Sequence, residues 1–227
     1  MLTISTPYPY QEIKRKNVNG KRLYETESGA LPSVTTILDK TKSEEKKQIL
    51  NNWKKRVGEE QAQQIVTEAA NVGTIMHGIL EHWVKNETHD PGNNFIHQQA
   101  KRMAQTVIAN VEPHLNEVWG SEVNLYYPGL YAGTTDLLGV WKGKPAIMDF
   151  KQTNKPKKRE WIEDYFMQAA AYGMAHNELY NTNIEHAAIF MCSRECEWQL
   201  FEVDPDEFKF WTEKWAERVE KFYNGSF

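Results

Sequence analysis

Cysteine is scarce in this 227-residue chain, which contains only Cys192 and Cys196. Two thiols cannot complete a four-cysteine zinc or iron–sulfur site. A disulfide between them is not expected in the reducing cytosol. We therefore interpret both cysteines as reduced structural residues.

Long apolar runs are also absent, because no segment approaches the roughly eighteen apolar residues of a membrane span. The first residues have neither the basic-then-apolar form of a secretory signal nor the Arg-rich amphipathic form of a transit peptide. We expect a cytoplasmic protein with no membrane partner, located in the host cytoplasm if a phage encodes it.

The chain has no excess of positive charge, since its formal net charge is −4. Any nucleic-acid binding must therefore depend on local basic patches rather than on a global field. Hydrophobic content of 40% with 12% aromatic residues is typical of a globular protein. A chain of this length can bury a substantial core as one large domain or two small ones.

Two short acidic motifs are the most informative feature of the chain. Residues 133–136 read Gly-Thr-Thr-Asp, and residues 149–151 read Asp-Phe-Lys. The segment between them predicts two strands joined by a tight turn at Lys142 and Gly143. In that register Trp141 pairs with Lys144, and Asp136 lies directly opposite Asp149. Opposed Cβ atoms in an antiparallel pair are about 4.5–5.5 Å apart.

Two bare carboxylates at that separation repel by roughly 3 kcal/mol at an effective dielectric constant near 20. Lys151 supplies part of the compensating charge, because it shares a strand face with Asp149. A hard divalent cation, which prefers carboxylate oxygens, would supply the rest. The alternative is that Asp136 ends a strand, Asp149 caps a turn and Lys151 is solvated. The buried character of the strand favours the metal site, because an unpaired carboxylate there is costly.

Periodicity and capping signals give the predicted element order. The first thirty residues look extended, with a hairpin turn at Asn19 and Gly20. Ser33 is expected to cap a short helix, and Ser43 a helix that Gly58 ends. The remaining predicted helices are 59–85, 94–119 with a break at Pro113, 160–180 and a final one through 208–222. The predicted strands are 122–127, 131–141, 146–152, 185–192 and 197–203.

This order predicts an α/β (α+β) fold with a central mixed β-sheet flanked by helices. We expect a single domain, 1–227. Its N-terminal hairpin and helical part, 1–120, should arch over the sheet core, 121–227. The predicted strand–helix–strand unit from 146 to 192 should cross over with a right-handed connection.

Three further positions gain meaning beside the acidic pair. His77 lies between Gly73 and Gly78, and each glycine inside a helix costs about 1 kcal/mol relative to Ala. Something must therefore approach this helix closely, although a lone helical His is as often a satisfied core or surface residue. Glu122 could support the metal ligands without touching the metal, or bind a second metal. The alternative, equally favoured by the sequence, is an exposed residue of an edge strand.

Gln168 and Tyr172 are four residues apart on a predicted helix and share a face. The crossover brings that helix over Asp149 and Lys151, so the Gln168 amide can orient the lysine or a phosphate oxygen. The alternative is ordinary helix packing. A basic run follows the acidic site directly, as phosphate handling requires. It comprises Lys155, Lys157, Lys158 and Arg159.

Taken together, these residues resemble the RecB-like branch of the PD-(D/E)XK nucleases. That branch has, in order, a helical His, a Glu, a Gly-x-x-Asp, an Asp-x-Lys and a Gln-x-x-x-Tyr. Residues 31–38, Leu-Pro-Ser-Val-Thr-Thr-Ile-Leu, extend the likeness together with Trp53-Lys54 and Gly73-x-x-x-His77. They are similar to the family of the mitochondrial genome maintenance exonuclease and its phage and bacterial relatives.

The resemblance implies a restriction-endonuclease-like core that uses Mg²⁺ or Mn²⁺. Asp136, Asp149, the Phe150 carbonyl and His77 would bind the metal, and Lys151 would orient or activate the attacking water. Gln168, Tyr172 and Glu122 would support the site. Some relatives carry an iron–sulfur cluster held by four cysteines. None is expected here, because the chain has two.

The implied activity is metal-dependent hydrolysis of DNA, as an exonuclease on single-stranded ends, in replication, recombination or repair. The implied partners are DNA and other replication or recombination proteins. Alternatives are a site-specific endonuclease of the same superfamily and a catalytically inactive DNA-binding module. The expected DNA contacts, each of which is otherwise a solvated surface group, are Ser33, Thr35, Thr36, Lys54, Lys55, Arg56, Lys155, Lys157, Lys158 and Arg159.

Overall fold

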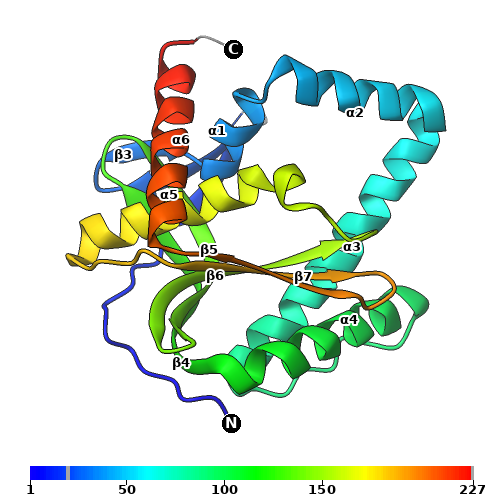
Figure 1. Ribbon diagram of the computed structural model, residues 1–227, viewed down its shortest axis with the longest axis horizontal. Helices are drawn as coiled ribbons and strands as arrows, with labels where there is room; N and C mark the ends of the chain where they lie inside the picture. Colours follow the sequence, from blue (N-terminus) through cyan, green and yellow to red (C-terminus); the bar gives the residue numbers. More distant parts are fainter. Residues whose placement is uncertain (19–20, 226–227) are drawn as a thin grey trace.

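A five-stranded mixed sheet forms the centre of the molecule (Figure 1). The computed structural model describes residues 1–18 and 21–225. The strand order is β4-β5-β6-β7-β8, and only β6 and β7 run parallel. The strands are β4 (Leu115–Tyr127), β5 (Tyr131–Trp141), β6 (Lys144–Thr153), β7 (Ala187–Ser193) and β8 (Trp198–Val203).

Helices cover both faces of this sheet (Figure 1). One face packs against α3 (Glu59–Val84) and α4 (Phe95–Val111), and the other against α5 (Glu163–Tyr180), α6 (Pro205–Tyr223) and α1 (Val34–Lys40). Met148 and Phe150 belong to the α3–α4 core, as the predicted strand pattern requires, whereas Ile147 belongs to the α5–α6 core. The predicted α/β class with a mixed, helix-flanked sheet is therefore confirmed.

A smaller three-stranded antiparallel sheet lies at the N-terminus. It comprises β1 (Lys14–Val18), β2 (Lys21–Thr26) and β3 (Gly29–Pro32). The predicted turn at Asn19 and Gly20 lies outside the described residues. The strand β3 was not predicted. It leads into α1 through Ser33, which forms a β-bridge with Ala132 of β5.

The predicted caps of the first two helices are confirmed. Ser33 accepts a hydrogen bond from the Thr36 N–H, and Ser43 accepts one from the Lys46 N–H at the start of α2 (Glu44–Val57). Gly58 ends α2 with φ +88°. No residue of α2 is buried, and α2 stands away from the sheet with the first part of α3 (Figure 1). The division at residue 120 stays a prediction.

One predicted helix was too long. The segment 94–119 was expected to be helical with a break at Pro113. The helix α4 does end just before that position, at Val111, and a 3₁₀ turn, η1 (Glu112–His114), contains Pro113, but no helix follows it. From Leu115 the chain pairs with β5, which extends β4 upstream of the predicted start at residue 122. Pairing with a neighbouring strand satisfies the backbone here, so tertiary contacts override local helical propensity.

The helix predicted from residue 160 begins later. A 3₁₀ turn, η2 (Arg159–Trp161), precedes α5, and its last residue donates to the Lys158 carbonyl. No helix in the described ranges, 1–18 and 21–225, is both long and apolar enough to cross a membrane.

Candidate metal and active site

The site begins where β5 and β6 separate. The predicted register is confirmed, because Trp141 pairs with Lys144 and the ladder continues to Leu137 and Met148. Beyond this last pair, the Phe150 N–H donates to the Asp136 carboxylate Oδ2 at 2.8 Å. A side chain thus replaces the backbone acceptor that a neighbouring strand would supply. This bond fixes the Asp136 carboxylate in the opening between the two strands.

Glu122 approaches the same point from β4. The register there is Ser121 with Leu137 and Val123 with Thr135, so Glu122 lies across from Asp136. Its backbone is left-handed, with φ +52°. A non-glycine residue in that conformation costs on the order of 1–3 kcal/mol, and such residues gather at functional sites.

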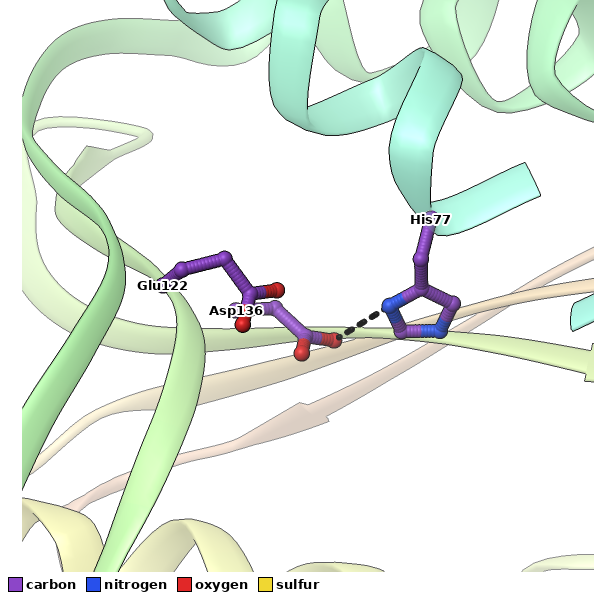
Figure 2. A group of neighbouring side chains, drawn as sticks. All are labelled: His77, Glu122 and Asp136. Atoms are coloured by element: carbon purple, nitrogen blue, oxygen red, sulfur yellow. Dashed lines mark ion pairs between the residues drawn. The ribbon is translucent and has the colours of Figure 1, made fainter. Parts of the chain in front are cut away.

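His77 of α3 completes a group of three potential ligands. Its Nδ1 atom lies 3.5 Å from Asp136 Oδ2. His77, Glu122 and Asp136 each offer one ligand atom, and these atoms all lie within 4.8 Å of one another. Figure 2 shows the imidazole and both carboxylates directed toward a common point.

Asp149 and Lys151 lie beside this group on β6. Asp149 is 4% exposed, and its carboxylate forms an ion pair with the Lys151 ammonium. Burial raises the pKa of Asp149 to about 7, although Lys151 opposes the rise. Burial lowers the pKa of Lys151, but Asp149 and Asp136 outweigh that effect and leave it raised. The Lys151 ammonium also lies 4.9 Å from the Tyr165 ring centroid.

The pKa values of the other two carboxyl groups, Asp136 and Glu122, are also raised. Burial raises the pKa of Asp136, opposed by Lys151 and by hydrogen bonds with the Phe150 N–H and with Asp149. Glu122 is exposed on the edge strand β4, but partial desolvation of its carboxylate and then the charge of Asp136 raise its pKa to about 7. Burial and the charge of Lys151 lower the pKa of His77. The imidazole is therefore neutral at neutral pH, which is the form that binds metals.

These donors fit a divalent cation such as Mg²⁺ or Mn²⁺. Carboxylate oxygens are the ligands of both ions, and an imidazole nitrogen suits Mn²⁺ alongside them. A bound cation would favour the ionised carboxylates that burial opposes. The geometry groups Glu122, rather than Asp149, with His77 and Asp136. The ligand set expected from sequence, with Asp149 and the Phe150 carbonyl, stays a prediction.

Gln168 and Tyr172 meet the site from α5. The Gln168 Nε2 donates to the Tyr172 hydroxyl at 3.1 Å. A Cβ atom at Gly133 would lie 2.6 Å from Tyr172 Cε1, closer than atoms can approach. The glycine of the Gly-Thr-Thr-Asp motif therefore allows the Tyr172 ring to pack against β5.

A cleft of about 830 Å³ joins these elements. It contains eight of the side chains singled out from sequence, which are Ser33, Thr35, His77, Glu122, Asp136, Lys151, Gln168 and Tyr172. Asp149 and Phe150 lie behind this lining. The other expected DNA contacts are not part of it, namely Thr36, Lys54, Lys55, Arg56, Lys155, Lys157, Lys158 and Arg159.

The basic run after the site makes contacts of its own. Arg159 forms an ion pair with Glu207 at 2.6 Å and lies 4.6 Å from the Phe166 ring centroid. The Lys158 ammonium lies 5.4 Å from the Trp161 ring centroid. Lys155 is exposed. Of this run, the Arg159 charge is the one that forms an ion pair with a carboxylate among residues 1–18 and 21–225.

The hydroxyl groups at the start of α1 differ in how accessible they are to a ligand. Ser33 is 2% exposed, and its Oγ accepts the Thr36 N–H at 3.0 Å while contacting the Thr35 and Thr36 hydroxyls. Its main contribution is therefore the helix cap. Thr35 is exposed and lines the cleft, so its hydroxyl can meet a ligand.

Several lining residues were not identified from sequence. Glu81 follows His77 by four positions on α3, so helical spacing alone would have placed it on the same face. Arg15, Arg22 and Tyr24 come from the N-terminal sheet. No local pattern marks them, because only the docking of that sheet on β5 brings them to the cleft.

Comparison with known proteins gives distant relatives. No protein-family profile matches the chain. It is 25% identical over 209 residues to mitochondrial genome maintenance exonuclease 1 of Xenopus tropicalis. It is 24% identical over 207 residues to the Homo sapiens protein of the same name. These alignments cover 86% and 85% of this chain, but the chain spans only 58% of each relative.

Among solved structures, the chain is similar to a candidate exonuclease from Eubacterium rectale. The TM-score is 0.45, with 13% identity and 69% of each chain covered. SSO0001 gives a TM-score of 0.35 with 13% identity over 74% of this chain and 69% of that one.

Proposed function

We propose that the protein is a divalent-metal-dependent DNA exonuclease of the RecB-like branch of the PD-(D/E)XK nucleases. It hydrolyses phosphodiester bonds at single-stranded DNA ends. The observation that carries this proposal is the convergence of His77, Glu122 and Asp136 in one cleft with the Lys151 ammonium. The similarity to proteins named exonuclease, over 86% and 85% of this chain, supports it.

His77, Glu122 and Asp136 would hold Mg²⁺ or Mn²⁺, with Asp149 adjacent. When bound, such an ion lowers the pKa of water and neutralises the charge that develops on the phosphate. The Phe150 N–H keeps the Asp136 oxygen in place, and α3 presents the imidazole. The protein thereby supplies a preorganised set of donors, which is the main protein contribution to such sites.

Lys151 acts as a cation in this scheme. The raised pKa keeps its ammonium protonated at neutral pH, so it stabilises negative charge and does not accept a proton. The ion pair with Asp149 holds the ammonium at the edge of the cleft. Gln168 and Tyr172 also line the cleft, joined by their hydrogen bond, and would restrict where a phosphate group can lie.

The preference for free ends rests on α2 and the first part of α3, which lead into the part of α3 that lines the cleft. The helix α2 has no buried residue and stands off the body with the first part of α3 (Figure 1). Such an arrangement suits a single strand that enters from an end. A role in DNA replication, recombination or repair, in the cytoplasm, belongs to the same proposal.

The experiment compares end-labelled linear single-stranded DNA with covalently closed single-stranded circles. Each is incubated with Mg²⁺, Mn²⁺ or EDTA and with wild type or Lys151→Ala. Lys214→Ala is the matched control, because Lys214 is a partly exposed residue of α6 that pairs with Glu217 and does not line the cleft. We expect metal-dependent degradation of the linear DNA alone, at least a hundredfold slower in Lys151→Ala and unchanged in Lys214→Ala.

Three outcomes contradict the proposal in different ways. Cleavage of circles would assign a site-specific or nonspecific endonuclease. DNA retention on a gel without cleavage in either metal would assign a binding module. Degradation that persists in EDTA or in Lys151→Ala would show that the chemistry lies elsewhere.

A further inference from the structure

Two arginines of the N-terminal sheet face the cleft. Arg15 of β1 lies directly opposite Tyr24 of β2, and Arg22 precedes Tyr24 by two residues. All three therefore share one face of this sheet, since side chains alternate along a strand. Arg15, Arg22 and Tyr24 all line the cleft that contains Asp136.

This sheet is fixed to the catalytic sheet, so the arginines stand on a rigid element. The Tyr24 hydroxyl forms a hydrogen bond with Thr134 Oγ1 at 3.2 Å, and Thr134 donates to Asn124 at 3.0 Å. The Ser33 N–H donates to the Arg22 carbonyl at 3.1 Å. Thr134 precedes Asp136 by two residues, about 6.7 Å along a strand. The chain of contacts thus runs from the arginines to the metal-binding carboxylate.

Arg15 and Arg22 carry no paired charge in the part of the chain that the structure describes. Within residues 1–18 and 21–225, neither guanidinium forms an ion pair with a carboxylate. Both side chains are exposed. The adjacent Lys16, by contrast, points to the opposite face and pairs with Glu25 at 2.5 Å. Two unpaired guanidinium groups on one wall of a cleft form a receptor for an anion, and their planar forks match phosphate oxygens.

We propose that Arg15 and Arg22 bind a backbone phosphate of the substrate strand other than the one that is cleaved. This inference rests on the proposed function. The acidic group at Asp136 and the arginine pair are at separate places in one cleft, so both can act on one strand. The subsite holds the strand in register, and Tyr24 keeps it at a fixed separation from the metal-binding group.

The experiment measures KM, kcat and the salt dependence of binding for a labelled single-stranded oligonucleotide. Variants are Arg15→Ala, Arg22→Ala and Arg15→Lys, and Lys16→Ala is the control. Each arginine-to-alanine variant should raise KM on the order of tenfold, with a smaller change in kcat. Each should also reduce the slope of log affinity against log salt by about 0.7. Arg15→Lys should restore part of the affinity, because it keeps the charge without the fork.

A second measurement identifies the phosphate. Single linkages of the oligonucleotide are made neutral as methylphosphonates, one position at a time. At the linkage held by the arginines, the neutral substitution should weaken binding to wild type. Arg15→Ala should bind the substituted and the unsubstituted oligonucleotide with equal affinity, because it has already lost that contact. If the effect of the neutral linkage and the effect of Arg15→Ala add at every position tested, the inference is overturned.

Mn²⁺ affinity and melting temperature of each variant show whether the fold and the carboxylate group remain intact. If wild type degrades single strands but the arginine variants match Lys16→Ala in KM and salt slope, the phosphate subsite is wrong and the nuclease proposal stands. If wild type neither binds nor degrades DNA, both are wrong.

Discussion

The Asp136 carboxylate accepts the backbone N–H of Phe150 at 2.8 Å, so one side chain both closes the sheet and faces the cleft. Replacements at Asp136 can separate these two roles. Asp136→Asn keeps an oxygen acceptor but removes the buried charge. Asp136→Ala removes both and leaves the Phe150 N–H without its partner.

In urea denaturation without metal, we expect the free energy of unfolding of Asp136→Asn to lie within about 1 kcal/mol of that of wild type. Asp136→Ala should lose about 1–3 kcal/mol, the cost of an unsatisfied buried donor. Both variants should lose DNA hydrolysis by at least a hundredfold. Equal stabilities of the two variants would show that the hydrogen bond does not support the fold.

Binding of Mn²⁺ should be coupled to proton release. The pKa of Asp149 and that of Glu122 are both raised to about 7. Glu122 must be deprotonated to act as a ligand, and the charge of a bound cation also favours ionisation of the adjacent Asp149. Affinity for Mn²⁺ should therefore rise more than tenfold between pH 5.5 and about pH 7.5 and level off above. Calorimetry in buffers of different ionisation enthalpy measures the protons released. Glu122→Gln should bind more weakly and release fewer protons, and a pH-independent affinity in wild type would contradict this account.

The stability of the metal-free protein should fall as pH rises through the same range. The pKa of Asp149 is about 7 when folded, above its ordinary value of 3.8, because burial opposes ionisation. The unfolded chain ionises this group first, so the contribution of Asp149 to stability is fully present below about pH 4 and is lost as pH rises to about 7. Asp149 contributes at most roughly 4 kcal/mol to that decline. Asp149→Asn should flatten this part of the curve in denaturation experiments with EDTA, and an unchanged slope would refute the assignment.

Much of the site could be predicted because a short hairpin fixes its own register. The turn at Lys142 and Gly143 determines which residues of β5 and β6 oppose each other, and the ladder runs from Trp141 and Lys144 to Leu137 and Met148, the residues next to Asp136 and Asp149. In the same way, the four-residue spacing of Gln168 and Tyr172 predicted that their side chains lie on one face of a helix, where they form a hydrogen bond. Both inferences depend only on local geometry.

Long-range docking could not be predicted from such patterns. The left-handed backbone at Glu122 and the approach of Arg15 to the cleft depend on how β4 and the N-terminal sheet pack. The basic run after the site also shows that contacts between distant segments cannot be predicted from local sequence. Arg159 was expected to contact DNA, but its partner Glu207 lies 48 residues away in the sequence. Composition cannot distinguish a charge reserved for a ligand from one paired within the fold.

The two helix glycines near His77 have different physical reasons. A Cβ atom at Gly73 would lie 3.2 Å from Gln152 Cγ, so packing within the protein explains that glycine. At Gly78 a Cβ atom would meet nothing within 4 Å, yet Gly78 lines the cleft. The protein therefore accepts the cost of a glycine in mid-helix without a neighbour that requires it.

Gly78→Ala should raise the free energy of unfolding by about 0.8–1 kcal/mol, because alanine is the better helix former. It should also lower kcat/KM for single-stranded DNA at least threefold, since the added methyl group occupies space that the strand uses. Gly133→Ala is the matched comparison. Its Cβ would meet Tyr172 at 2.6 Å, so it should destabilise the protein by about 1–3 kcal/mol. A Gly78→Ala enzyme that is more stable and fully active would show that no substrate approaches α3 at this position.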